Sequence, residues 1–458
     1  ALPLAVQALE ACQYQADFAA LDRYLDRLRR GEFTPSSDTE LVDCLETLLF
    51  LVLYFDIDAA DLLDFYRSYS AAAPRVYGAP VALPPRRGSG RIRIGYLSGD
   101  LRDHVMGKMI WEEVRRHDRS RFELYFYSVS DVSDAWTARY RALSDHFITL
   151  ADATEREAAE RIAADEIDLL VDLSTNTRGA KPGILALRPA PVQITHVASA
   201  GVVGLRAVDF KLTDAFADLP ENQAGQLETL LPIEGCVYPY RHIVPAAVHP
   251  YRRDRLGIDA DAIVIAAFVN PMKLSRRCLL LWRAVLDRIP RALLAISPLS
   301  SGAGEAQQRL FAAAGIARER TIVLPVGRDD AENQARYAVV DLVLDPMPYG
   351  GVNGTLEALD MGVPVVTLCG RRHGERSSYS ILANLGVLDT VAHNPDDYVA
   401  IAGRLADDRV FNAQVKAAIR AGLARSPLTD MDAHTRNLEH AYIMALERRY
   451  PAALEGRR

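Results

Sequence analysis

Cysteine is scarce in this chain of 458 residues, and the cysteines that are present form no metal-binding pattern. The five cysteines lie far apart, and neither a C-x-x-C motif nor a Cys/His cluster occurs; they are Cys12, Cys44, Cys236, Cys278 and Cys369. Structural zinc sites use closely spaced ligands, so the sequence predicts none. Scattered, unpaired cysteines are typical of reduced thiols, which favours a cytoplasmic protein.

Long apolar runs and a strong charge of one sign are missing as well. The apolar run at residues 48–54 (LLFLVLY) is too short to span a bilayer and is soon followed by Asp56, so it predicts a buried helix and no membrane span. The formal net charge is -7. Nothing in this balance indicates nucleic acid or an anionic membrane as a partner.

Several catalytic signatures are also lacking. The chain contains no G-x-S-x-G elbow, no P-loop and no H-E-x-x-H motif. The D-x-D string of metal-dependent glycosyltransferases occurs at residues 56–58, 259–261 and 430–432. None of these follows a predicted lobe strand, where a metal–diphosphate site is expected. We therefore expect no metal and no cofactor.

What the sequence does contain is a change of texture near residue 79. Residues 1–78 carry apolar side chains at spacings of three and four, which predicts helices. Residues 79–90 are rich in Pro, Gly, Ser and Arg and are predicted to be a linker. Beyond the linker, strands and helices alternate, which indicates parallel βαβ units.

These units fall into two series, which predicts an α/β protein with two Rossmann-like lobes. Strands are expected in the first lobe (91–250) at 91–97, 122–128, 167–173, 192–197 and 208–212. In the second lobe (251–430) they are expected at 263–268, 292–296, 321–324, 341–345 and 364–368. A C-terminal helix and tail are predicted at 431–458. The sequence contains no repeat of 20–50 residues, so it does not predict a solenoid.

The most informative stretch is residues 342–367 (LVLDPMPYGGVNGTLEALDMGVPVVT). A hydrophobic strand leads into a glycine loop, and the loop leads into a helix that begins near Asn353. Glycines allow a ligand to approach the backbone, and the free amides of a helix start favour a diphosphate. Glu357, about one turn further on, is placed to bind ribose hydroxyls. The alternative interpretation is an ordinary βα turn with Asn353 as the N-cap.

Two further loops carry candidate groups. Residues 266–277 (AAFVNPMKLSRR) place Lys273 after a strand, where its ammonium would neutralise a leaving phosphate; the alternative is a solvated lysine. Residues 97–108 (LSGDLRDHVMGK) place His104 after the first strand, as a general base or as a surface histidine. His196 lies within a predicted strand and is interpreted as a hydrogen-bonded core residue.

At these loops the chain resembles one family, which comprises O-GlcNAc transferase, the SPINDLY proteins and the bacterial adhesin N-glucosyltransferases. The resemblance runs from about Ala8 to the C-terminal helix, and the order and spacing of its anchors match. The anchors are IRIGYLSGDLRDH (92–104), ALRPAPVQ (186–193), GVVGLRAVDFKLTD (201–214), AFVNPMK (267–273), ARYAVVDLVLDPMPYGG (335–351) and EALDMGVPVVTLCG (357–370).

The resemblance implies a GT-B fold and an inverting, metal-independent transferase that moves a sugar from a nucleotide-sugar onto a protein or peptide. It also implies that residues 1–78 are a remnant of, or a cap to, tetratricopeptide helices. His104 and Lys273 stand at its catalytic positions. Among its donor-binding positions, Arg336 is expected near the nucleobase and Glu357 at the ribose. All of these positions are Asn270, Lys273, Arg336, Gly351, Asn353, Gly354, Thr355 and Glu357.

Departures from the family pattern keep the sugar open. Val352-Asn353-Gly354 replaces a His/Thr run of O-GlcNAc transferases and is more similar to the N-glucosyltransferases, whereas Glu357 is more similar to SPINDLY. The expected donor is UDP-GlcNAc with a Ser/Thr acceptor, then UDP-glucose with an Asn acceptor, then GDP-fucose. A GT-B sugar-nucleotide epimerase and a degenerate nucleotide-binding scaffold are the competing hypotheses.

Overall fold

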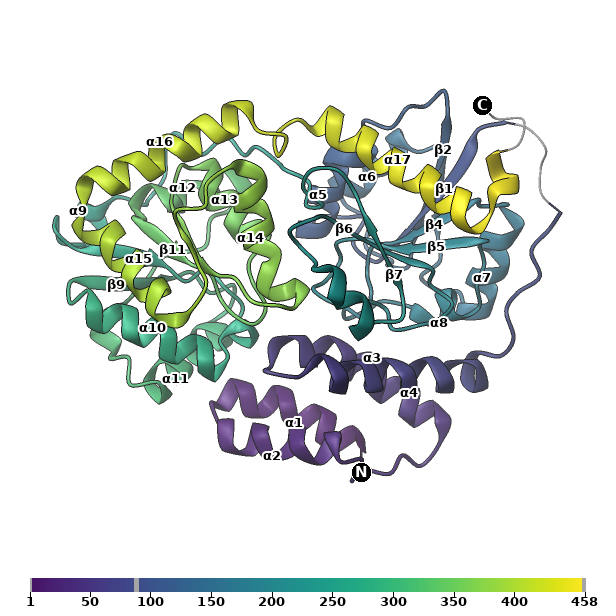
Figure 1. Ribbon diagram of the computed structural model, residues 1–458, viewed down its shortest axis with the longest axis horizontal. Helices are drawn as coiled ribbons and strands as arrows, with labels where there is room; N and C mark the ends of the chain where they lie inside the picture. The colour runs from purple at the N-terminus through teal and green to yellow at the C-terminus, as the bar shows by residue number, and fades with distance from the viewer. Residues whose placement is uncertain (1, 86–89, 455–458) are drawn as a thin grey trace.

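The computed structural model describes residues 2–85 and 90–454. Residues 86–89 of the predicted linker and 455–458 of the predicted tail lie outside the described residues. Figure 1 shows two α/β lobes side by side, with a layer of N-terminal helices packed along one edge of both. The predicted fold class, two Rossmann-like lobes with a helical N-terminal region, is confirmed.

Residues 2–77 form a helical region. Ser37 begins its third helix by accepting a hydrogen bond from the amide of Glu40, which is the usual role of a serine at an N-cap. The apolar run at 48–54 is buried except for the half-buried Phe50, because it ends one helix and continues as a 3-10 turn. The helices are α1 (Leu2–Gln15), α2 (Phe18–Arg29), α3 (Asp38–Leu51) and α4 (Ala59–Tyr77), and the 3-10 turn is η1 (Val52–Tyr54).

The N-terminal lobe is built on a parallel sheet with the strand order β3-β2-β1-β4-β5-β6-β7. Its strands are β1 (Ile92–Ser98), β2 (Phe122–Ser128), β3 (His146–Thr149), β4 (Leu169–Asp172), β5 (Val192–Thr195), β6 (Phe210–Thr213) and β7 (Thr229–Pro232). The helices between them are α5 (Val105–Val114), α6 (Ala135–Leu143), α7 (Glu155–Ala164) and α8 (Pro182–Ala186).

The C-terminal lobe repeats this plan in the order β10-β9-β8-β11-β12-β13. Its strands are β8 (Ile263–Ala266), β9 (Ala292–Ile296), β10 (Thr321–Val323), β11 (Leu342–Leu344), β12 (Val365–Leu368) and β13 (Val391–Ala392). Its helices are α9 (Arg253–Leu256), α10 (Arg276–Arg288), α11 (Ser301–Ala313), α12 (Asp330–Ala335), α13 (Asn353–Asp360), α14 (His373–Leu385) and α15 (Pro395–Asp407).

The central strands match the expected apolar runs, but three strands at or near sheet edges were not expected from the sequence. These are β3, β7 and β13, of two to four residues each. β3 and most of β7 are half-buried or exposed, so neither shows a continuous apolar run. A strand of two residues such as β13 has no detectable period at all.

The C-terminal helices return the chain to the first lobe. α16 (Arg409–Arg425) leaves the C-terminal lobe and α17 (Met431–Arg449) packs against α5, β5 and β7, as the yellow helices of Figure 1 show. Buried Glu113 on α5 accepts from His434 Nε2 at 2.7 Å and from His196 Nε2 at 3.0 Å. The interpretation of His196 as a hydrogen-bonded core residue is therefore confirmed.

Burial alone would raise the pKa of Glu113, but the two imidazoles lower it to about 2. The carboxylate therefore stays charged and fastens α17 to the N-terminal lobe, which ties the two lobes together through the chain end. No helix of the described ranges is long and apolar enough to cross a membrane.

Candidate active site

The two predicted donor loops meet at the point where the strand order of the C-terminal sheet reverses. β8 and β11 are hydrogen-bonded neighbours, yet the chain passes through β9 and β10 on one side before it returns as β11. Connections that diverge in this way leave a crevice at the carboxyl ends of the two strands, which is where such sheets bind ligands. Lys273 comes after β8 and Gly351 comes after β11.

The turn after β8 places Lys273 against the second loop. Asn270 begins the 3-10 turn η3 (Pro271–Lys273) by accepting a hydrogen bond from the amide of Met272 at 2.9 Å. Lys273 Nζ then donates to the carbonyl oxygen of Gly350 at 2.9 Å and lies 4.3 Å from the centre of the Tyr349 ring. The structure thus brings the predicted lysine and the predicted glycine loop together.

The half-buried ammonium of Lys273 has an altered proton affinity. Burial lowers the pKa of Lys273 to about 8, and the nearby Asp345 carboxylate opposes part of that effect. The amine is therefore mostly protonated at neutral pH but incompletely compensated by its surroundings. An arriving diphosphate would supply the missing negative charge.

Asp345 holds the glycine loop and was not predicted as a site residue. Its Oδ1 accepts from the amide of Gly351 at 2.7 Å, and its Oδ2 accepts from Thr367 Oγ1 at 2.8 Å. Burial raises the pKa of Asp345 to about 6 despite these hydrogen bonds. The only signal in the sequence was its place after a hydrophobic strand.

Gly350 is needed in this loop because another backbone segment lies against it. A Cβ atom there would lie 2.9 Å from the carbonyl oxygen of Gly374, at the start of α14. The amide of Gly350 donates to that same oxygen at 2.9 Å. The loop between β11 and α13 (residues 345–352), which we call the donor loop, is therefore fixed to the start of α14.

Helix α13 starts directly after the loop, and no side chain in the described chain caps its first turn. Val352 occupies the N-cap position, so the alternative that Asn353 is the N-cap is wrong. Asn353 is the first helical residue, and its Nδ2 instead donates to Glu357 Oε1 at 2.6 Å. Because no side chain satisfies them, the first amides, including that of Gly354, remain available for an anion.

Thr355 faces the loop rather than the crevice. Its Oγ1 donates to the carbonyl oxygen of Gly351 at 3.0 Å and lies 2.7 Å from Ser378 Oγ. Thr355 is 2% exposed. Its hydroxyl therefore braces the loop between α13 and α14, and only its backbone amide belongs to the helix start.

Arg336 and Glu357 are both neighbours of Tyr337, the first along the chain and the second through a hydrogen bond. Arg336 begins the 3-10 turn η5 (Arg336–Val339); its guanidinium lies 4.7 Å from the centre of the Phe268 ring and donates to Ser297 Oγ at 2.7 Å. The Tyr337 hydroxyl donates to Glu357 Oε2 at 3.4 Å, and burial raises the pKa of Glu357. Both residues are largely buried beside the crevice.

His104 lies in the other lobe, at the N-cap of α5. Its Nδ1 is 3.3 Å from the amide of Met106 and 3.3 Å from Asp100 Oδ2, and burial lowers its pKa. The two contacts belong to different tautomers, because Nδ1 either accepts from the Met106 amide or carries a proton and donates to Asp100. Only the tautomer that donates to Asp100 leaves Nε2 free to accept a substrate proton. Gly107 permits this tight turn, because a Cβ there would lie 2.3 Å from the carbonyl oxygen of Asp100.

An ion-pair cluster connects the His104 loop with the C-terminal lobe. Lys108, one turn after His104, donates to Asp330 Oδ1 at the start of α12 at 2.8 Å. Asp330 also pairs with Arg241, which lies between β7 and α9. The His104 loop therefore lies at the interface between the two lobes, next to the C-terminal lobe.

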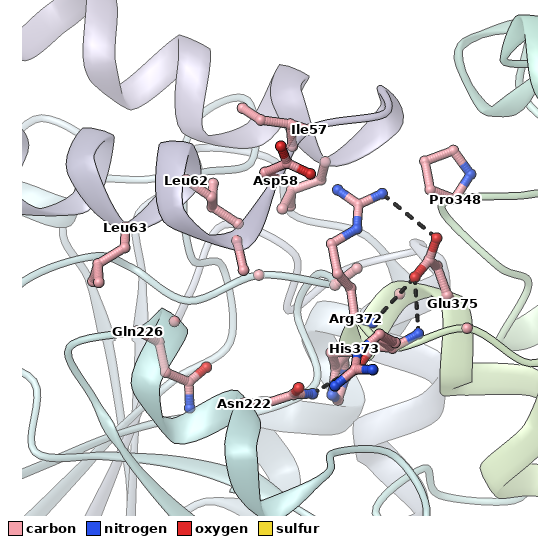
Figure 2. A pocket seen from close by; sticks show the side chains of 18 of the residues that line it. Ile57, Asp58, Leu62, Leu63, Asn222, Gln226, Pro348, Arg372, His373 and Glu375 are labelled. Carbon is pink, nitrogen blue, oxygen red and sulfur yellow. Dashed lines mark hydrogen bonds and ion pairs between the residues drawn. The ribbon is translucent and has the colours of Figure 1, made fainter. Parts of the chain in front are cut away.

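A separate pocket of about 870 Å³ lies where the helical region and both lobes meet. Figure 2 shows Ile57 and Leu62 of the helical region opposite Asn222 of the N-terminal lobe and Arg372 of the C-terminal lobe. Its described lining includes none of the predicted donor residues, but Pro348 and Gly374 place it next to the donor loop. Sequence reasoning missed this pocket because its walls come from widely separated segments.

Comparison with known proteins identifies the family to which this chain belongs. Residues 78–231 and 241–438 match glycosyl transferase family 41. The chain is 29% identical over 367 residues to the probable UDP-N-acetylglucosamine--peptide N-acetylglucosaminyltransferase SPINDLY of Petunia hybrida, which covers 78% of this chain and 39% of that protein. It is 26% identical over 412 residues to the corresponding probable enzyme SEC of Arabidopsis thaliana, with coverages of 86% and 42%. The chain thus spans about two fifths of these relatives.

Among solved structures, a mutant of the Thermobaculum terrenum O-GlcNAc transferase is 28% identical with a TM-score of 0.80, and the match covers 99% of this chain and 85% of that one. Anabaena HepE, solved with UDP and glucose, shares the fold at 13% identity and a TM-score of 0.51, with coverages of 77% and 100%. The match over most of the chain and the two facing Rossmann-like lobes together establish that this chain belongs to glycosyl transferase family 41 and has the GT-B fold.

Proposed function

We propose that this chain is the catalytic part of an inverting glycosyltransferase that moves a sugar from a nucleotide-sugar onto a protein or peptide. The carrying observation is the meeting of the Lys273 ammonium with the loop that leads into the uncapped start of α13. A lysine and a helix start that converge on one crevice favour a departing diphosphate. The SPINDLY and SEC relatives are named as probable peptide N-acetylglucosaminyltransferases.

In the proposed reaction an acceptor group attacks the anomeric carbon in line with the leaving diphosphate. Lys273 exchanges its hydrogen bond to the Gly350 carbonyl for a phosphate oxygen, and the amides of Asn353 and Gly354 bind a second oxygen. Preorganised donors of this kind contribute roughly 3–4 kcal/mol each to the transition state. Asn270 and Arg336 would border the donor, and Glu357 would accept from the ribose hydroxyls.

His104 is proposed as the group that accepts the acceptor proton. In the form proposed to act as the base, Nδ1–H donates to Asp100 and orients the ring, which leaves Nε2 unprotonated, and the lowered pKa keeps the imidazole neutral. We propose that the acceptor enters from the pocket bordered by Pro348 and Gly374, because that pocket adjoins the donor loop and is lined by all three parts of the molecule.

We further propose that the reaction needs no metal ion. The charge of the diphosphate would be met by Lys273 and by the amides of α13. The described cysteines are free thiols, which supports a cytoplasmic site of action. UDP-GlcNAc with a Ser/Thr acceptor is the first choice, because the SPINDLY and SEC relatives are named for UDP-N-acetylglucosamine and a peptide.

The second candidate is a UDP-glucose-dependent transferase that acts on Asn. The specific observation is the hydrogen bond that Asn353 donates to the carboxylate of Glu357. It engages the carboxylate proposed to bind the ribose, and it gives the start of α13 a different surface from a His/Thr run. This difference affects which sugar and which nucleobase the site would accept, and not how it would bind the diphosphate.

A donor panel tests both candidates. The protein is incubated with UDP-GlcNAc, UDP-glucose or GDP-fucose and a whole-cell lysate, and intact-mass spectrometry identifies modified proteins. We expect addition of one N-acetylhexosamine; addition of a hexose would favour the second candidate. Conversion of the sugar nucleotide without any acceptor would indicate an epimerase, and UDP binding without any product would indicate a scaffold.

A further inference from the structure

The turn that carries Lys273 is held by two buried glutamine side chains from outside the turn. Gln13 of α1 donates through Nε2 to the carbonyl oxygens of Pro271 at 3.1 Å and Leu274 at 2.9 Å. Gln307 of α11 donates through Nε2 to the carbonyl oxygen of Val269 at 2.8 Å. Both ends of the turn are therefore fixed by amide groups, one of which comes from the N-terminal helical region.

The burial of these glutamines shows that the contacts are specific. Gln13 is 0% exposed and Gln307 is 1% exposed, and the Oε1 atom of each is buried without a hydrogen-bond partner in the described chain. A buried amide oxygen without a partner is unfavourable. The NH₂ groups therefore account for the orientation of both side chains, since each must face a backbone carbonyl.

The turn also packs into two different cores. Met272 is buried within an apolar cluster that joins the helical region to part of the N-terminal lobe, whereas the nearby Leu274 is buried within the cluster that contains the core of the C-terminal lobe. Helix α1 packs directly against η3 and α11. The position of the lysine backbone is thus set jointly by its own lobe and by the N-terminal helices.

The helical region reaches Lys273 from a second side through aromatic rings. Tyr54 of η1 stacks on Tyr349, with ring centres 4.8 Å apart and planes 16° apart. The Lys273 ammonium lies 4.3 Å from the centre of the same Tyr349 ring, and the Tyr349 hydroxyl accepts from the amide of Ala200 at 3.2 Å. The surface under the ammonium is therefore fixed by the helical region as well.

We propose that the N-terminal helical region is a working part of the donor site, in which Gln13 and Tyr54 are positioning residues that set the location of the Lys273 ammonium. Gln13 acts on the backbone of the turn and Tyr54 acts on the ring beneath the amine. This inference rests on the proposed function, since it assigns the effect to stabilisation of the leaving diphosphate by Lys273.

Gln13→Met tests the proposal, because methionine keeps the length of the side chain and removes its donor. The matched control is Gln7→Met, the same change at an exposed position of the same helix. We expect Gln13→Met to lower kcat by about 10- to 50-fold, since small displacements of a catalytic group cost up to about 100-fold. The KM for the acceptor and the activity of Gln7→Met should change less than about twofold.

A double-mutant cycle separates positioning from general destabilisation. In a Lys273→Ala background, Gln13→Met should lower kcat by less than about twofold, because the group that it positions is gone. An undiminished loss in that background would overturn the proposal. If Gln13→Met does not fold, Tyr54→Leu takes its place in the same cycle, with the same expected and contrary results.

Labelling of amines distinguishes failure of this inference from failure of the proposed function. The chain has five lysines, so acetylation of Lys273 can be followed individually by peptide mass spectrometry as a function of pH. Gln13→Met should raise the labelling midpoint of Lys273, because a loosened turn exposes the amine to water. An unchanged midpoint would contradict the positioning role even if the wild-type chain transferred no sugar.

Discussion

The two lobes place the same structural device at equivalent points of their sheets. In the N-terminal lobe β4 ends at the buried Asp172, which accepts from the amides of Ser174 and Thr175 at 3.1 and 2.8 Å. In the C-terminal lobe β11 is followed by the buried Asp345, which accepts from the amide of Gly351. Burial raises the pKa of each carboxyl to about 6. Both carboxyl groups therefore shape the loop after a central strand.

The lobes differ in the helices to which their loops lead. In the N-terminal lobe the start of α5 is capped by His104 itself, and the loop after β4 leads only to the five-residue helix α8. In the C-terminal lobe the loop whose Gly350 carbonyl accepts from Lys273 leads straight into α13, and the start of α13 has no side-chain cap in the described chain. In the proposed mechanism one scaffold thus serves as an anion site in one lobe and as a site for proton transfer in the other.

The largest expected effect comes from removing the cation of the C-terminal lobe. Lys273→Ala should lower kcat about 100-fold, since the leaving diphosphate loses its main positive partner. Steady-state kinetics with the preferred donor measures the change. Lys416→Ala on α16, a helix that supplies none of the proposed donor-site residues, serves as the control and should retain normal activity. Near-normal transfer by the Lys273 variant would contradict the proposal that the C-terminal lobe supplies the anion site.

His104→Asn should lower kcat by about 10- to 100-fold while the fold is kept. Asparagine can still cap α5, so the loss would report the missing base and not a missing cap. Thermal unfolding measured beside the kinetics checks this separation. An equal loss of activity and of melting temperature would reduce His104 to a structural residue.

The pH dependence of kcat/KM should have one limb from each lobe. Above about pH 8 the rate should fall roughly tenfold per unit, because Lys273 in the free protein loses its proton there. The acid limb should lie below the ordinary histidine range, because burial lowers the pKa of His104. The residual activity of Lys273→Ala should lack the alkaline limb, and that of His104→Asn the acid limb. A flat profile across pH 7–9 would contradict the role of Lys273.

Replacing the two buried carboxyl groups compares the loops themselves. Asp345→Ala should raise the KM for the donor by roughly 5- to 10-fold, whereas Asp172→Ala should leave it within about twofold, since only the first carboxyl braces the donor loop. Both changes should lower the free energy of unfolding by roughly 1–3 kcal/mol, because buried loop amides lose their acceptor. Equal effects on donor KM would mean that the loops are not specialised.

The smallest expected effect is that of metal removal. Treatment with EDTA followed by gel filtration should leave kcat within about twofold, because the proposed charge partners of the diphosphate are Lys273 and backbone amides. Loss of activity that is restored by added Mg²⁺ or Mn²⁺ would overturn the metal-independent mechanism.

Local patterns in the sequence determined the lobes and the place of the donor loops. Buried central strands are continuous apolar runs, and the residues that end them are turn formers with strong backbone preferences, so residues 263–268 and 341–345 and the loops after them could be predicted. The edge strands β3 and β13 could not, because they are short and lack the apolar period on which such predictions depend.

Only the tertiary structure decided which groups act together. The contact between Gln13 and Pro271 spans 258 residues, and the return of α17 to Glu113 spans 321. Neither leaves a trace in local periodicity, because a buried glutamine or histidine is recognised only by what surrounds it. The sequence therefore determined where Lys273 and the glycine loop lie along the chain, and long-range packing decided that the N-terminal helices hold them in place.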